Sequence, residues 1–290
     1  MREVRLRAFA KLNYALDVLG LRADGYHEVS TVMQSISLAD EVELRRATGG
    51  FDLSLVPKEV EVGPQERNTA YLAWNVLRRL TNKELPVKLT LRKEIPARAG
   101  LGGGSADAAA VLVGLNELFG LGLRVDELRG IGAGIGADVP FCISGGTALG
   151  EGFGEILTPL PAPSDHLLVV AKPPSSVDTG EIYHAFDEVR TKSTHCVEPV
   201  VEALRSGSLS VLAAAVGNDL APVTRGIVPE VAELEQSLRT SGALGTSMSG
   251  SGTAIFGIFD DAETAGIAKD KVDGSFSGVH KPVSRGVEIT

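Results

Sequence analysis

The chain has 290 residues, of which 43% are hydrophobic and 22% are charged, and its formal net charge at pH 7 is −9. This length is sufficient for one large domain or two ordinary ones. The acidic balance argues against wholesale binding to nucleic acid or to an anionic membrane surface.

The cysteines and the apolar runs narrow the class further. Cys142 and Cys196 form no C-x-x-C pair, so structural zinc is not expected and a reducing compartment such as the cytoplasm is favoured. No apolar run reaches the length of a membrane span. Residues 1–5 lack the apolar core of a secretory signal, so we expect no signal peptide.

The first part of the chain predicts a series of strands and then a helix. Alternating apolar and polar residues predict strands over 4–10, 9–19, 29–36, 41–44 and 51–55. Lys11 lies inside this pattern, and a strand lysine ordinarily points to solvent. A helix is predicted over 68–80, which Asn68 or Thr69 can cap.

A turn is predicted over Arg22–Glu28, where Asp24 and Gly25 are followed by Tyr26 and His27. An aromatic ring and an imidazole on a loop tip could stack on a ligand ring and hydrogen-bond to its edge. Alternatively, Tyr26 and His27 are two ordinary residues of a surface turn. The turn pattern by itself favours this alternative.

The stretch from Pro96 to Asp107 combines glycines with a predicted strand before it, over 87–91, and a helical pattern after it, from Ala108 to Phe119. Glycines let successive N–H groups curl around an anion, and the start of a helix adds unpaired N–H groups and a positive dipole end. Neither the dinucleotide pattern nor the P-loop pattern fits, and a flexible turn is the alternative. We predict a site for a phosphate chain.

One aspartate stands in an otherwise apolar and glycine-rich segment, 131–142. A buried carboxylate needs a charged or hydrogen-bonding partner. Asp138 is therefore either a helix cap or turn residue ahead of Pro140, or the partner of a lysine at a reaction centre. The glycine- and proline-rich residues 150–164 then predict a domain boundary.

The second half alternates helices with strands, which predicts an α+β sandwich. Helices are predicted over 179–189, 197–204, 209–216, 228–238 and 262–272, and strands over 167–171, 254–259 and 279–289. A second glycine- and serine-rich loop, 244–253, again offers many N–H and hydroxyl donors.

Three segments together resemble the motifs of the GHMP kinase superfamily: Ala10–Asn13, Pro96–Ala106 and Met248–Gly252. The resemblance implies a two-domain α+β fold. Residues 1–155 would form an N-terminal, ribosomal-S5-domain-2-like domain with the ATP loop and the catalytic pair. Residues 156–290 would form a C-terminal, ferredoxin-like α/β sandwich.

Two further segments, Arg22–Glu28 and Ile135–Phe141, resemble signatures of the 4-diphosphocytidyl-2-C-methyl-D-erythritol kinase family. The resemblance implies ATP-dependent phosphorylation of the substrate's 2-hydroxyl in the non-mevalonate route to isopentenyl diphosphate. The alternatives are another small-molecule GHMP kinase, of the homoserine or mevalonate type, and a non-catalytic nucleotide-binding regulator. The implied partners are ATP, Mg²⁺ held mainly through phosphates, and a cytidine diphosphate substrate, with the protein a monomer or a weak homodimer.

The resemblance also implies the site residues. Lys11 and Asp138 would be the catalytic pair, because a carboxylate can accept or orient the hydroxyl proton while an ammonium stabilises the developing alkoxide. Nucleotide would be bound by Asn68, Lys93, Pro96, Ala97, Arg98, Ala99, Gly100, Leu101, Gly102, Gly103, Gly104, Ser105 and Ala106. Substrate would be bound by Asn13, Tyr26, His27, Asp138, Thr179 and Tyr183.

Within these sets the resemblance makes more specific assignments. Tyr26 and Tyr183 would stack on the two faces of the cytosine, and His27 would hydrogen-bond to its edge. Arg98 would either face solvent or contact phosphate. Asp107 stands where other members often carry asparagine.

Overall fold

Two long antiparallel strands organise the computed structural model, which describes residues 2–23, 25–57, 65–189 and 193–290. β1 (Glu3–Leu21) and β2 (His27–Arg46) pair along nearly their whole lengths, with irregularities of register in β1 on either side of the Lys11–Asn13 segment. Asp24 of the predicted turn lies outside the described residues.

The predicted break between strands 29–36 and 41–44 is wrong, because β2 runs through it. Asp40 lies in this stretch and is fully buried. Its Oδ1 accepts the N–H groups of Glu94 and Ile95 at 2.6 and 2.9 Å, so the carboxylate is satisfied inside the fold. The sequence shows only that a charged residue stands at this position. Aspartate is depleted in strands and is rarely fully buried, so the pattern predicts a break.

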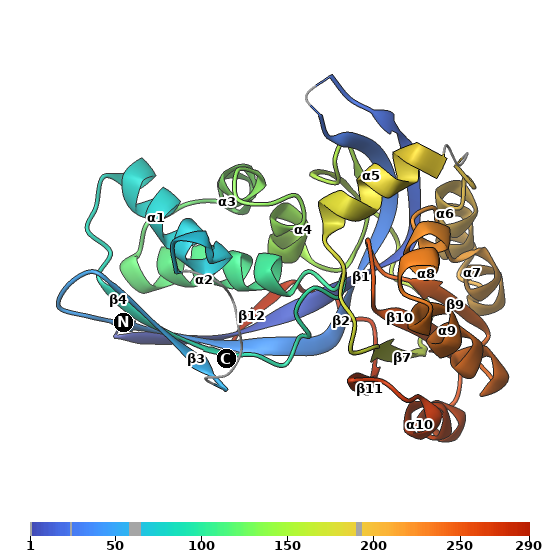
Figure 1. The fold of residues 1–290 in the computed structure, drawn as a ribbon. Coiled ribbons are helices and arrows are strands. Elements are labelled where there is room, and N and C mark those ends of the chain that lie inside the picture. The colour runs from blue at the N-terminus through green and yellow to red at the C-terminus, as the bar shows by residue number, and fades with distance from the viewer. Residues whose placement is uncertain (1, 24, 58–64, 190–192) are drawn as a thin grey trace.

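The first sheet has the strand order β12-β1-β2-β4-β3, with β5 added beside β2, β6 beside β5 and β8 beside β1. Its further strands are β3 (Phe51–Val56), β4 (Val87–Arg92), β5 (Thr147–Glu151), β6 (Ile156–Pro159), β8 (Gly217–Asn218) and β12 (Val287–Ile289). One face of it is covered by α1 (Thr69–Thr81), α2 (Gly103–Phe119), α3 (Val125–Ala133) and α4 (Val139–Ser144), as Figure 1 shows, and the short 3₁₀ helix Gln65–Arg67 precedes α1.

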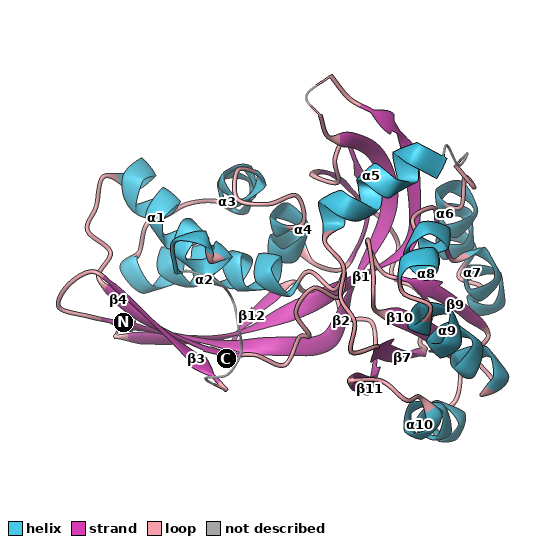
Figure 2. Cartoon of the chain, in the orientation of Figure 1, coloured by secondary structure: helices cyan, strands magenta, loops and turns pink. Residues whose placement is uncertain are grey.

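The second sheet is antiparallel, in the order β11-β7-β10-β9. Its strands are β7 (Leu167–Lys172), β9 (Gly245–Met248), β10 (Ile255–Phe259) and β11 (Phe276–His280), and the helices of this half are α5 (Thr179–Val189), α6 (Val197–Ser206), α7 (Leu209–Ala215), α8 (Ala221–Ile227), α9 (Glu230–Thr240) and α10 (Ala262–Lys271). Figure 2 shows α1–α3 and α6–α10 at opposite ends of the molecule. No helix of the described ranges is long and apolar enough to cross a membrane.

The predicted closing strand 279–289 is wrong, because this segment forms two strands in different sheets. β11 pairs with β7, whereas β12 returns to the first sheet and pairs with β1. Pro282 lies between the two strands and forms an isolated antiparallel bridge with Ile36 of β2, where the chain passes from one sheet to the other. The backbone passes close to α4 here, since a Cβ on Gly286 would lie 1.9 Å from the carbonyl oxygen of Cys142.

The sequence patterns also missed several short elements. These are α4, α8, β6, β8 and β9, each seven residues long or shorter. The two helices are at most two turns long, which is too short for a period of 3.6 residues to emerge. β6 lies in the stretch predicted as a domain boundary, and β8 has two residues. The missed strand β9 lies in the predicted glycine- and serine-rich loop.

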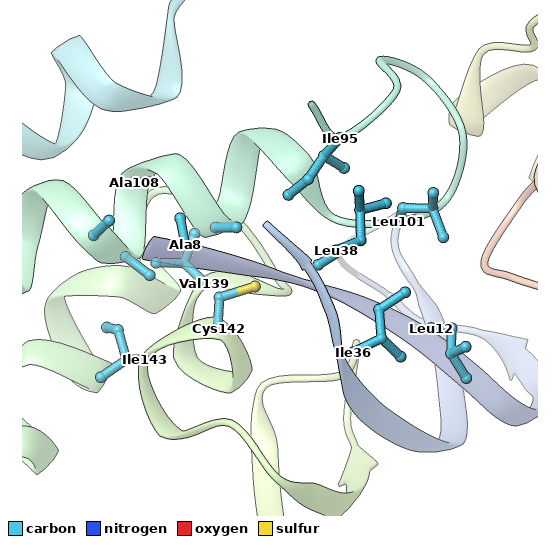
Figure 3. Packing of buried hydrophobic residues seen from close by; sticks show 14 of the residues in the cluster. Ala8, Leu12, Ile36, Leu38, Ile95, Leu101, Ala108, Val139, Cys142 and Ile143 are labelled. Atoms are coloured by element: carbon cyan, nitrogen blue, oxygen red, sulfur yellow. The ribbon is translucent and has the colours of Figure 1, made fainter. Parts of the chain in front are cut away.

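The core beneath the site is formed by α2 packed closely on the first sheet. Figure 3 shows Ala108 of this helix near Ala8 of β1 and Val139 of α4. Small residues permit the close approach: a Cβ on Gly114 would lie 2.4 Å from Leu44 Cδ1. The packing therefore fixes the position of the N-terminus of α2, which lies at the cleft described below.

We expect Gly114→Ala to lower the free energy of unfolding by about 1–3 kcal/mol, the usual effect of overpacking a core. Alanine is the better helix former, so propensity alone predicts the opposite sign. The matched control is Gly130→Ala in α3, where a Cβ meets nothing within 4 Å. Urea denaturation of both variants measures the effect, and equal stabilities would contradict the tight packing at Gly114.

Candidate active site

A cleft of about 1000 Å³ collects residues from distant parts of the chain. Residues of β1, β2, the 96–105 loop, α2, α5 and the loop before β10 line it. All the residues predicted for catalysis, nucleotide or substrate line this cleft, apart from Ala106. Ala106 is fully buried, and its N–H donates to the carbonyl oxygen of Gly102 at 2.8 Å. It therefore stabilises the end of the loop and does not face the cleft.

Lys11 and Asp138 form an ion pair in the cleft, with Nζ 3.3 Å from Oδ2. The lysine side chain is 5% exposed and the aspartate side chain 30%. Asp138 occupies the N-cap position of α4, but its side chain makes no capping hydrogen bond. The carboxylate thus serves the pair with Lys11, where it balances an otherwise costly buried ammonium.

Asn13 holds the ammonium of Lys11 from the same strand. Lys11 Nζ donates to Asn13 Oδ1 at 2.8 Å, and Asn13 Nδ2 donates to Thr31 Oγ1 at 2.7 Å. The Thr31 hydroxyl donates in turn to the carbonyl oxygen of Ala15, also at 2.7 Å. This relay orients the Asn13 amide, so that its oxygen faces the ammonium. Thr31 was not predicted, because a threonine in a strand carries no signal of its own.

The first glycine loop ends at the N-terminus of α2. Ala106 makes the first helical hydrogen bond, so the N–H groups of Gly103, Gly104 and Ser105 precede the hydrogen-bonded ladder. The first turn, all of it in the described part of the chain, contains no acidic residue. These amides and the positive dipole end suit an anion. Arg98 is exposed and lines the cleft, so both of its predicted positions stay open.

The second glycine loop packs directly on the first. Ser249 Oγ donates to the carbonyl oxygen of Gly100 at 2.9 Å, and a Cβ on Gly100 would lie 2.0 Å from the carbonyl oxygen of Ser249. Asn218 Nδ2 donates to the carbonyl oxygens of Met248 and Gly250, both at 2.8 Å. Asn218 was missed as a positioning residue, since its partners lie in a loop that only the fold brings beside it.

Lys93 lies between two buried carboxylates. Its Nζ is 2.5 Å from Asp40 Oδ2 and 2.6 Å from Asp107 Oδ2, and Asp107 Oδ1 has no hydrogen-bond partner among the described residues. Burial raises the pKa of Asp107 to about 7, against the attraction of Lys93. Burial lowers the pKa of Lys93, but the two carboxylates outweigh it and the net shift is upward. The predicted nucleotide contact of Lys93 would therefore come from a residue already engaged in this triad.

Asn68, one of the two predicted caps, is the N-cap of α1. Its Oδ1 accepts the N–H of Ala70 at 2.8 Å, and the residue lines the cleft. The neighbouring Thr69 Oγ1 donates to the carbonyl oxygen of Gly104 at 2.6 Å, which ties the start of α1 to the start of α2.

Aromatic residues gather at another part of the cleft. The rings of His27 and Tyr183 stack at a centroid distance of 4.7 Å, and His27 Nε2 lies 2.8 Å from Asp187 Oδ1. Tyr26 is 64% exposed, with its ring 5.6 Å from that of Phe153. Burial raises the pKa of the Tyr183 phenol, so this hydroxyl stays neutral. His27 thus already covers one face of Tyr183, and the predicted cytosine sandwich with Tyr26 stays a prediction.

Thr179 connects this aromatic part to the second glycine loop. It begins α5, and its Oγ1 lies 2.9 Å from Ser251 Oγ, a residue that also lines the cleft. Ser251, Phe153 and Asp187 were not predicted to line the cleft. Ser251 belongs to the Met248–Gly252 motif, whereas Phe153 and Asp187 lie outside the motifs.

The chain is similar in sequence to known proteins over both of its halves. The family models "GHMP kinases N terminal domain" and "GHMP kinases C terminal" match residues 68–146 and 200–278. A 4-diphosphocytidyl-2-C-methyl-D-erythritol kinase of Thermoanaerobacter pseudethanolicus is 40% identical over 291 residues, which cover 100% of this chain and 99% of the relative.

The chain also has the same fold as two solved structures. A crystal structure of 4-(cytidine 5′-diphospho)-2C-methyl-D-erythritol kinase matches with a TM-score of 0.81 and 31% identity, over 96% of this chain and 98% of that one. A homoserine kinase from Cytophaga hutchinsonii matches with a TM-score of 0.77, over 100% and 98% of the two chains. Its identity is 18%, so this second likeness concerns the fold.

Asp107 leads to a prediction about stability and pH. Its folded-state pKa of about 7 lies above the ordinary 3.8, so the folded protein holds a proton that the unfolded chain releases between these values. The stabilisation from this proton is complete below about pH 4 and is lost as the pH rises through about 7. Asp107→Asn carries no such proton, so the stability of the variant relative to the parent should rise from pH 5 to pH 8.

Urea denaturation at the two pH values measures this change. Asp126→Asn is the matched control, because the Asp126 side chain is 82% exposed. The same stability difference at pH 5 and pH 8 for Asp107→Asn would contradict the perturbed carboxyl.

Proposed function

Because the chain belongs to the 4-diphosphocytidyl-2-C-methyl-D-erythritol kinase family of the GHMP kinases, we propose that it transfers the γ-phosphoryl group of ATP to the 2-hydroxyl of 4-diphosphocytidyl-2-C-methyl-D-erythritol. The products are the 2-phosphate and ADP, in the non-mevalonate route to isopentenyl diphosphate. The observation that carries the proposal is the position of the Lys11–Asp138 pair beside the glycine loop. A Cβ on Gly102 would lie only 2.9 Å from Lys11 Cγ.

The ion pair supports a direct transfer between the two substrates. The 2-hydroxyl oxygen forms a bond to the γ-phosphorus, while the bond from that phosphorus to the oxygen bridging it to the β-phosphorus breaks. Asp138 accepts or orients the hydroxyl proton. The ammonium of Lys11, held by Asn13, stabilises negative charge as it develops on the attacking oxygen.

The N-terminus of α2 supports binding of the triphosphate. The N–H groups of residues 103–105 would donate to phosphate oxygens, and the helix dipole adds to their attraction. Mg²⁺ would neutralise the phosphate charge when it is bound. Of the residues that the structure describes, no three His, Cys, Asp or Glu side chains form a group suited to a metal. In our proposal the ion is held mainly by phosphate oxygens, with the hydroxyl of Ser105 nearby.

The aromatic part of the cleft supports a cytidine diphosphate substrate. Tyr26, Tyr183 and His27 offer ring faces and a ring edge, which are the groups that bind a nucleobase. Thr179 lies between this part and the second glycine loop, where it would meet the rest of the substrate.

The remaining properties of the chain support a small-molecule enzyme of the cytoplasm. The net charge of −9 disfavours a nucleic-acid or anionic-membrane partner. Cys142 and Cys196 are buried free thiols, which suits a reducing compartment. We propose a monomer or a weak homodimer.

The function is tested by a substrate screen at fixed ATP. We expect phosphorylation of the cytidine diphosphate sugar alcohol and none of homoserine, galactose or mevalonate. Turnover of homoserine or mevalonate instead would support the other small-molecule GHMP kinases. Nucleotide binding with no turnover of any acceptor would support a regulator.

Asp138→Asn should lower kcat by about a hundredfold or more, the range for lost general-base assistance, with ATP affinity largely unchanged. The amide keeps the shape of the side chain but accepts a proton far less readily. Steady-state kinetics and ATP titration measure the two quantities. Asp126→Asn, on the exposed surface, is the control, and a kcat within a few fold of the parent for Asp138→Asn would show that the carboxylate is structural.

Gly100→Ala should weaken ATP binding by about tenfold or more. The added Cβ meets the Ser249 carbonyl oxygen at 2.0 Å, and the φ of +75° strains any residue with a side chain. The two glycine loops would have to separate, which moves the amides away from the phosphates. ATP titration of this variant is compared with Gly130→Ala, and an unchanged affinity would mean that the contact between the loops does not shape the nucleotide site.

A further inference from the structure

Two residues of helix α5 contact the imidazole of His27, one at a ring face and one at a ring edge. Tyr183 and Asp187 stand four residues apart on α5, and therefore on the same face of it. Tyr183 stacks on the imidazole with an angle of 27° between the rings, and Asp187 Oδ1 lies 2.8 Å from His27 Nε2. The His27 side chain is only 9% exposed, so the ring is held in one plane and at one edge.

The partner at Nε2 decides where the ring proton lies. An ionised carboxylate only accepts hydrogen bonds, so Nε2 must carry the hydrogen that Asp187 accepts. In the neutral ring the other nitrogen, Nδ1, then has a lone pair. Among the described residues Nδ1 has no hydrogen-bond partner, and His27 lines the cleft. The ring therefore retains an acceptor for a ligand, at a residue that lines the cleft.

We propose that Asp187 is a positioning residue that holds His27 in the Nε2–H tautomer and so makes the cleft prefer cytosine over uracil. This inference rests on the proposed function, because it needs the nucleobase of the substrate to lie at the aromatic part of the cleft. The histidine itself contacts the base, and Asp187 acts through it.

The chemistry of the two bases gives the preference its sign. Cytosine carries an exocyclic amino group, a hydrogen-bond donor, where uracil carries a carbonyl oxygen, an acceptor. An Nδ1 lone pair pairs with the amino group and opposes the carbonyl oxygen. The opposite tautomer, with hydrogen on Nδ1, would reverse both interactions. Selectivity between the bases thus depends on a proton that the carboxylate of Asp187 keeps on the far side of the ring.

The same helix offers a matched control for a charge effect alone. Glu188 is the next residue, and its carboxylate lies 3.7 Å from His184 Nδ1 with both side chains more than two-thirds exposed. Removing this charge leaves the hydrogen bond between Asp187 and His27 in place. The pair of positions therefore separates tautomer control from the general acidity of α5.

The experiment compares kcat/KM for the cytidine substrate and for its uridine counterpart. We expect Asp187→Asn to lower the ratio of the two values by about tenfold, because the Asn amide can donate to Nε2 and favour the other tautomer. Asp187→Glu, which keeps a carboxylate, should retain most of the preference, and Glu188→Gln should leave it unchanged. Asp187 is exposed, and thermal melts verify that its variants fold.

Equal losses for both substrates in Asp187→Asn would overturn the inference, since a structural role lowers both alike. Nitrogen-15 NMR of the imidazoles gives a second readout without substrate, with His27→Gln to assign the signal. We expect hydrogen on Nε2 in the parent, and a signal for hydrogen on Nδ1 would overturn the inference. A parent that phosphorylates no cytidine substrate would refute the proposed function instead, and the NMR would still decide the tautomer.

Discussion

An ammonium and a carboxylate placed within 3.3 Å of each other are the constraint on which the site depends. Lys11 is nearly buried, and a buried ammonium without a partner destabilises a fold. Asp138 supplies the balancing charge from the start of α4, and Asn13 holds the ammonium within the strand. Because the pair needs both partners in place, β1 and the start of α4 must keep their relative positions.

The glycine loops serve that requirement through close backbone contact. Their carbonyl groups and Cα atoms approach so tightly that a side chain at Gly100 would have no space. Ser249 and Asn218 then hold the second loop by hydrogen bonds to its backbone or to the first loop. The site that we propose for a triphosphate would thereby consist mainly of main-chain groups, through which an acidic chain can bind a highly charged anion.

The buried polar groups behind the site explain where the sequence patterns failed. Asp40 interrupts the apolar alternation of β2, yet its carboxylate is satisfied by Lys93 and by backbone N–H groups from the next segment. The pattern around it therefore predicts a break that the fold does not contain. Alternation with a period of two residues carries no information about tertiary partners of this kind. It also does not show that β12 returns to the first sheet.

The sequence by itself determined the strand–glycine loop–helix unit and most of the longer elements, and it narrowed the cap of α1 to Asn68 or Thr69, because these follow from local spacing. It also singled out Lys11 and Asp138, through motifs that resemble a known family. Only the tertiary structure decided that Lys11 meets Asp138, that Ser249 seats on Gly100 and that α5 grips His27 with Tyr183 and Asp187. Those contacts join segments far apart in the chain, and their geometry depends on how whole sheets and helices pack rather than on any local pattern.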